Sequence, residues 1–158
     1  MKVTKIIRIV LLVIACITFF VGLSFSKIAS DKAAHDLSKI KVSITQKSTS
    51  SSEVYLTYEI KNNTKVNWSY LEIKTYVYDK SGNSLGAITA TLGTNYSNSD
   101  LKLEKGKKIS KKVTLKYDNS DFMQTLYDAN LSDLVFESEV TYGSYYNSNG
   151  SFSDFSFY

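Results

Sequence analysis

Residues 53–60, EVYLTYEI, alternate between polar and apolar side chains without a break. In an extended chain successive side chains point to opposite faces, so the apolar members of this set share one face. They are Val54, Leu56, Tyr58 and Ile60. A period of two predicts a β-strand with one face in a hydrophobic core.

The same period recurs on both sides of this strand. We expect further strands at residues 40–44, 68–79, 84–92, 109–117, 136–142 and 151–158. A serine-rich loop at 47–52 and a hairpin turn at 79–83 separate some of them. Residues 118–128 break the alternation, and Ser120 is placed to cap a short helix there. About seven strands at this spacing predict an all-β, antiparallel sandwich of two sheets.

The alternation also assigns individual side chains to a face. In the strand at 68–79, one face is expected to carry Leu71, Ile73, Thr75 and Val77. The opposite face is expected to carry Trp68, Tyr70, Tyr76 and Tyr78. In the strand at 136–142, Phe136, Ser138, Val140 and Tyr142 fall on one face.

The run IIRIVLLVIACITFFVGLSF, residues 6–25, is apolar and carries no charge after Arg8. A helix rises about 1.5 Å per residue, so such a run is long enough for the roughly 30 Å hydrocarbon core of a bilayer. We therefore expect residues 1–26 to form a single transmembrane anchor, residues 27–37 a helical stalk, and residues 38–158 one β-sandwich domain.

Two other fates of this run stay open. Residues 24–26, SFS, fit a signal-peptide cleavage site, and cleavage there would release a secreted protein. Residues 13–16, VIAC, resemble a bacterial lipobox, with Cys16 as the residue that would carry the lipid. Basic residues flank the run on both sides, but the short basic tail resembles the start of a signal sequence. We expect the amino terminus inside the cell and the domain outside.

Charge and cysteine content limit the classes of function. The first 26 residues hold three of the 19 basic residues and none of the 15 acidic ones, so the remaining chain has a net charge of +1. Such a weak excess gives no support for nucleic-acid binding. The single cysteine, Cys16, leaves no intrachain disulfide, so the domain must be stabilised by packing.

Three segments together resemble a known family. They are residues 60–64 (IKNNT), residues 73–82 with TYVYD followed by a glycine, and residues 103–107 (LEKGK) before a strand. This pattern resembles the FxLYD-type immunoglobulin-like domains of bacterial envelope proteins, which are distantly similar to the late-embryogenesis-abundant sandwich. The resemblance covers roughly residues 38–145. It implies an immunoglobulin-like sandwich on a membrane-tethered protein, with no catalytic residues.

Motifs for catalysis or cofactor binding are weak in this chain. Residues 24–27 and 38–41 have Ser-x-x-Lys spacing without the companion motifs of serine enzymes. Four residues fit the ligand positions of a calcium loop: Asp128, Asn130, Ser132 and Glu139. Asp133 stands where that loop needs glycine, so a polar helix-to-strand connection is the preferred interpretation. We expect no enzyme activity and no cofactor.

Lysines concentrate around the strand at 109–117. The candidates for contact with an anionic surface are Lys105, Lys107, Lys108 and Lys112. Lysines on an edge strand also prevent pairing with other chains, whereas a functional cluster would bind anionic wall polymer or lipid headgroups. We therefore expect a membrane-tethered, non-catalytic interaction or envelope module, whose partner is an envelope protein or an anionic wall polymer. A secreted or lipid-anchored binder of wall polymer or glycan, and an enzyme with a site outside known motifs, are the alternatives.

Overall fold

A computed structural model of the chain describes residues 36–94, 101–146 and 152–156, with backbone alone for residues 146 and 152–156. The predicted anchor, the cleavage site, Cys16 and most of the predicted stalk lie outside these residues. Among the described residues, no helix has the length and apolar character needed to cross a membrane. The described residues belong to one compact unit.

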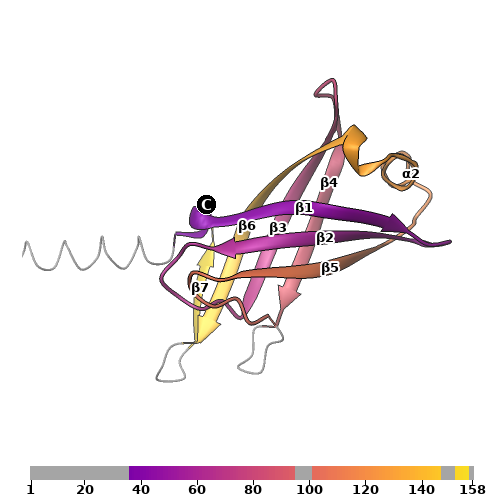
Figure 1. Cartoon of the computed structure of the whole chain (residues 1–158). Helices are drawn as coiled ribbons and strands as arrows, with labels where there is room; N and C mark the ends of the chain where they lie inside the picture. The colour runs from indigo at the N-terminus through magenta and orange to yellow at the C-terminus, as the bar shows by residue number, and fades with distance from the viewer. Residues whose placement is uncertain (1–35, 95–100, 147–151, 157–158) are drawn as a thin grey trace, which may run out of the picture. The chain divides into compact units, whose positions relative to one another are not determined.

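Two antiparallel sheets build this unit, so the prediction of a mostly β, antiparallel fold with one short α-helix is confirmed. The first sheet has the order β1-β2-β5, and the strands are β1 (Ile40–Thr49), β2 (Glu53–Asn62) and β5 (Lys108–Lys116). The second has the order β4-β3-β6-β7, and the strands are β3 (Tyr70–Asp79), β4 (Ser84–Gly93), β6 (Leu134–Tyr146) and β7 (Phe152–Ser156). Figure 1 shows the first sheet lying across the second. The described residues also form three helical segments: η1 (Leu37–Lys39), α2 (Asp121–Asp128) and η2 (Leu131–Asp133).

The core lies between the inner faces of β2 and β3. The residues predicted to share one face of each strand are fully buried, and they are Val54, Leu56, Tyr58, Ile60, Leu71, Ile73, Thr75 and Val77. One polar contact joins the sheets inside this core, because the Tyr58 hydroxyl lies 3.2 Å from Thr75 Oγ1. Burial raises the pKa of the Tyr58 hydroxyl. Thr75 Oγ1 also lies 2.9 Å from Ser138 Oγ, so this buried hydroxyl has partners on both sides.

Helix α2 covers one end of the sandwich. Ser120 caps it as predicted, since its hydroxyl accepts a hydrogen bond from the Met123 amide at 3.2 Å. Met123 and Leu126 are buried in the core, and Phe122 packs over Gly86 of β4. A Cβ at Gly86 would lie only 2.6 Å from the Phe122 ring, so this contact requires glycine.

A β-bulge interrupts β1 and the strand runs on to Thr49, so the predicted loop at 47–52 is shortened to residues 50–52. Ile44 pairs with Tyr58 but Gln46 pairs with Thr57, so Thr45 is an extra residue. Strand β1 therefore continues to Thr49 with its faces exchanged, and Lys47 lies opposite buried Leu56 on the inner side.

The inward-facing Lys47 binds the end of helix α2. Its Nζ donates hydrogen bonds to the carbonyls of Tyr127 at 3.0 Å and Ala129 at 2.7 Å. These carbonyls belong to the helix C-terminus, where no helical partner is available and the helix dipole favours a cation. Burial lowers the pKa of the Lys47 ammonium, while the charge of Asp128 acts in the opposite direction.

Two aromatic side chains lie on other faces than predicted, one of them because of a second bulge. Val140 pairs with Ile73 and Tyr142 with Glu72, so Thr141 is the extra residue and Tyr142 turns outward. Its ring meets Tyr70 edge-on with centroids 5.7 Å apart. Trp68 was predicted on the face opposite Leu71. It is 1% exposed and belongs to the core, because it lies before β3 in a bridge to Leu103 and packs edge-on against Tyr145 at 5.6 Å.

The domain also begins slightly earlier than predicted. Leu37, placed at the end of the stalk from sequence, is 3% exposed and belongs to the core. Asp36 caps η1 by accepting a hydrogen bond from the Ser38 amide at 3.0 Å. This cap fixes the entry of the chain into β1.

Candidate functional site

Three lysines form a row across the outer face of the first sheet. Lys41 of β1 is paired in register with Lys61 of β2, and Lys61 is paired with Lys108 of β5. All three side chains are exposed. Adjacent strands lie about 4.8 Å apart, so the row spans about 10 Å of surface. We call these three residues the lysine row.

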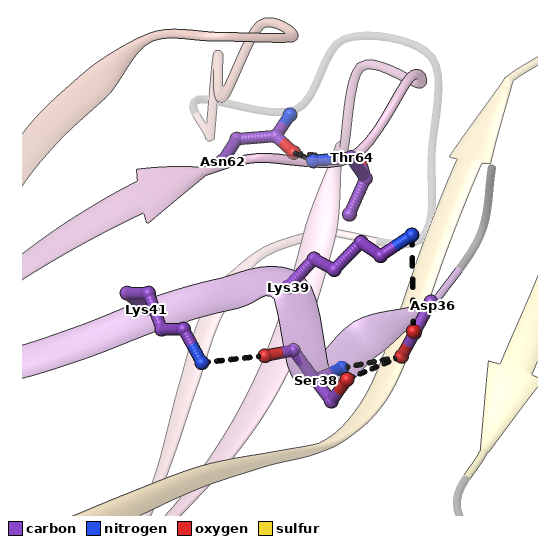
Figure 2. A network of polar contacts seen from close by, with 6 residues as sticks. All are labelled: Asp36, Ser38, Lys39, Lys41, Asn62 and Thr64. Carbon is purple, nitrogen blue, oxygen red and sulfur yellow. Dashed lines mark hydrogen bonds and ion pairs between the residues drawn. The ribbon is translucent and has the colours of Figure 1, made fainter. Parts of the chain in front are cut away.

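The charges of the lysine row are only partly compensated. Lys108 Nζ lies 2.8 Å from Glu59 Oε2, which is an exposed ion pair. Lys41 Nζ donates to the Ser38 carbonyl at 3.1 Å, a neutral partner (Figure 2). Within the described part of the chain, Lys61 has no carboxylate within 4.0 Å. Like charges directly opposite each other on neighbouring strands destabilise a sheet, so this arrangement lowers the stability of the fold.

The turn after Leu103 extends this basic surface. It is fastened to the end of β2 by two backbone hydrogen bonds, from the Asn62 amide to the Lys107 carbonyl at 2.9 Å and from the Gly106 amide to the Asn62 carbonyl at 2.8 Å. Gly106 has a φ of +73°, which favours glycine. The exposed residues Lys105 and Lys107 therefore lie next to the row.

The side chain of Asn62, fully buried, holds this end of the sheet together. Its Oδ1 accepts hydrogen bonds from the Thr64 amide at 2.9 Å and the Thr64 hydroxyl at 2.6 Å, as drawn in Figure 2. Its Nδ2 donates to the carbonyls of Val66 at 2.8 Å and Leu103 at 3.2 Å. The Thr64 hydroxyl accepts in turn from the Trp68 indole at 2.9 Å. Asn62, the last residue of β2, is therefore the centre of a buried hydrogen-bond network.

The first residues of the domain form a second polar cluster beside the row. The Ser38 hydroxyl donates to Asp36 Oδ1 at 2.5 Å, and this bond, joined by the Ser38 amide, lowers the pKa of the Asp36 carboxyl. Lys39 Nζ lies 4.0 Å from the same carboxylate. Figure 2 shows Lys39 turned to Asp36 while Lys41 is turned to Ser38. Asp36 also interacts electrostatically with Lys41, so its charge acts on one end of the row.

The four lysines singled out from sequence occupy two places. Lys105, Lys107 and Lys108 lie at the lysine-row end of the sheet, while Lys112 lies further along β5 with its Nζ 3.7 Å from the centroid of the Tyr55 ring. Strand β5 is an edge strand, as expected for a lysine-rich strand.

Sequence reasoning missed Lys41 and Lys61. Each follows a buried isoleucine on its own strand, but their adjacency depends on strand register. Aligning the alternation of neighbouring strands is the only sequence signal that could have found them.

The four residues of the calcium pattern lie on separate elements. Asp128 ends α2 and accepts a hydrogen bond from Gln124, and Asn130 donates to Asp133 at 3.2 Å. Ser132 lies in η2, and Glu139 lies within β6, where it accepts from the Tyr76 hydroxyl at 3.2 Å. Among the described residues, no group of three or more histidine, cysteine, aspartate or glutamate side chains could hold a metal ion.

The aspartates with shifted pKa values are engaged in local structure. Side-chain hydrogen bonds from Asn83 and Ser120 lower the pKa values of Asp79 and Asp118, and the bond from Lys80 does so at Asp133. Asp79 and Asp118 accept from residues two to four positions along the chain, which is typical of turns and helix caps. A general acid would need the opposite shift.

Comparison of the chain with models of protein families, with curated proteins and with solved structures found no match.

Proposed function

We propose that this chain is a non-catalytic interaction module of the bacterial cell envelope, which binds a phosphate-bearing ligand through its lysine row. Residues 1–26 would hold it at the membrane as a single-pass anchor, with the domain on the extracytoplasmic side. The apolar run at 6–25 and the short basic tail before it support this location.

The strand order supports an immunoglobulin-like sandwich. In the constant-type immunoglobulin fold, strands one, two, five and four share a sheet, and strands three, six and seven share the other. This domain has the same arrangement except that β4 pairs with β3 rather than β5. The resemblance of residues 38–145 to FxLYD-type domains agrees with this assignment.

The lysine row is the observation on which the ligand class rests. Cross-strand lysine triplets cost stability, and the ion pair with Glu59 compensates only Lys108. An ammonium group binds phosphate as a point charge with three donors. Phosphate is common to anionic wall polymers and lipid headgroups, and both would bind in a salt-dependent manner.

A pair of double variants tests this proposal. Lys41→Gln with Lys61→Gln removes two charges from the row, whereas Lys112→Gln with Lys116→Gln removes two from the other end of the same sheet face. Binding of the full chain to isolated anionic wall polymer and to vesicles with anionic lipid is measured at low and high salt.

We expect the first variant to lose most salt-sensitive binding and the second to retain it. Equal losses in both variants would mean that only net charge matters, and unchanged binding in the first would refute the site. Binding to polymer alone or to vesicles alone would identify the source of the phosphate.

A further inference from the structure

The four sheet edges of this domain differ in charge. Strand β5 carries four lysines, β1 carries two, and β7 is only five residues long with one aspartate. Strand β4, SLGAITATLG, has ten residues and no charged side chain. Charged or short edge strands resist pairing with another chain, whereas a long uncharged edge permits it. Strand β4 is therefore the edge best suited to accept another strand.

The geometry of β4 also favours strand addition. From Gly86 to Gly93 it pairs with β3 without a register shift, so its free side is regular. Its inner residues Ile88, Ala90 and Leu92 are buried, and its outer residues Ala87, Thr89 and Thr91 are exposed and small. Small side chains allow a neighbouring backbone to approach to the strand spacing of about 4.8 Å.

We propose that β4 pairs antiparallel with β4 of a second copy of this chain, joining the two four-stranded sheets across a two-fold axis. In such a pair even-numbered residues must face even-numbered residues of the second copy, and odd-numbered residues must face odd-numbered ones. Otherwise buried side chains would oppose exposed ones. A register centred on Ala90 meets this condition. It places Thr89 opposite Thr91 of the second copy, and a threonine pair on neighbouring strands is favourable.

The charged residues of β3 next to β4 would form favourable pairs if a second copy bound in this register. Within one copy Thr91 pairs with Glu72 and Thr89 with Lys74 of β3. A row of four residues would therefore cross the junction, with Glu72 and Thr91 from one copy followed by Thr89 and Lys74 from the other. The two-fold axis generates a second such row, and each row ends in opposite charges. Self-pairing through β5 centred on Lys112 would instead set Lys108 against Lys116 of the second copy, which like-charge repulsion opposes. The occupant of the β4 edge is for this reason a second copy rather than a charged partner.

The test compares variants of the full chain by sedimentation velocity in detergent over a range of protein concentrations. Thr89→Lys with Thr91→Lys would place lysine against lysine in both symmetric rows. Thr89→Glu with Thr91→Lys carries the same number of charged substitutions but would place opposite charges together, both across the junction and against Lys74 and Glu72 of its own copy. Thr114→Lys adds a lysine to the β5 edge and is the control for charge at an edge that does not pair.

We expect concentration-dependent dimers for the natural chain and the Thr114→Lys variant, and a dimer dissociation constant raised about tenfold or more in the double-lysine variant. The lysine and glutamate combination should restore the dimer. Amide hydrogen exchange at residues 87–93 should slow as the concentration rises.

A monomer at all concentrations, or a dimer that the double-lysine substitution leaves intact, would overturn the proposal. So would a stable complex of β4 with a different protein in place of the second copy. Urea unfolding midpoints of the variants separate loss of pairing from loss of folding.

Discussion

The substitution Asn62→Ala should destabilise the domain more than its size suggests. The side chain is fully buried and makes four hydrogen bonds, which join the end of β2 to the loop before β3 and to the segment around Leu103. A hydrogen bond contributes about 1 kcal/mol net, and a buried group left without a partner costs about 1 to 3 kcal/mol. We therefore expect a loss of about 3 to 5 kcal/mol, against a total of about 5 to 15 kcal/mol for a typical domain.

Urea denaturation followed by tryptophan fluorescence measures this loss directly. Trp68 is the only tryptophan in the chain, and its indole donates to the Thr64 hydroxyl that Asn62 holds. Asn63→Ala is the matched control, because the Asn63 side chain is exposed, and its unfolding free energy should change by less than about 0.5 kcal/mol.

The variant Asn62→Asp distinguishes hydrogen bonding from packing. Aspartate has nearly the same shape, but its second oxygen would face the carbonyls of Val66 and Leu103 in place of the amide donor. We expect a large destabilisation at neutral pH although no cavity forms. If Asn62→Ala unfolds within about 1 kcal/mol of the natural chain with an unchanged urea slope, the buried network does not hold this end of the domain, and the reasoning fails.

Two further predictions concern the helix and acid stability. Lys47→Met should lower the unfolding free energy by about 2 kcal/mol, because the carbonyls of Tyr127 and Ala129 lose a charged donor; exposed Lys116→Met is the control in the same urea assay, and equal effects would contradict the capping role. Asp118 has a lowered folded-state pKa, so the stability it contributes is present above its unfolded value of 3.8 and is lost as the pH falls through the folded value. Urea midpoints measured from neutral pH to below 3.8 should fall less steeply in Asp118→Asn than in the natural chain, and parallel curves would show that Asp118 is not involved.

The lysine row is a feature that the alternation within a single strand does not predict. The alternation of each strand correctly predicts that Lys61 and Lys108 are exposed, since each is next to a buried or half-buried isoleucine. Their adjacency depends on which strands are neighbours and on their register, which are properties of residues far apart in the chain. A site built across three strands therefore cannot be read from any one of them.

The bulges show the same limit for side-chain direction. One extra residue at Thr45 turns Lys47 inward, and one at Thr141 turns Tyr142 outward. The second change reverses the predicted face of Tyr142, and the first gives an inward direction to Lys47, which was predicted in a loop. In both strands a single insertion shifts the face of every later residue. Such an insertion is recognised only from the way the strand pairs with its neighbour.

The sequence by itself determined the β class, the core faces of β2 and β3 and the cap of helix α2. These features depend on contacts between residues a few positions apart, where hydrophobic period and capping chemistry act directly. Only the tertiary structure decided that Asn62 is the centre of a buried network, that Trp68 is in the core and that three lysines share a row. These features arise where distant segments meet, and the physical reason is that burial and register are set by the partner strand as much as by the residue itself.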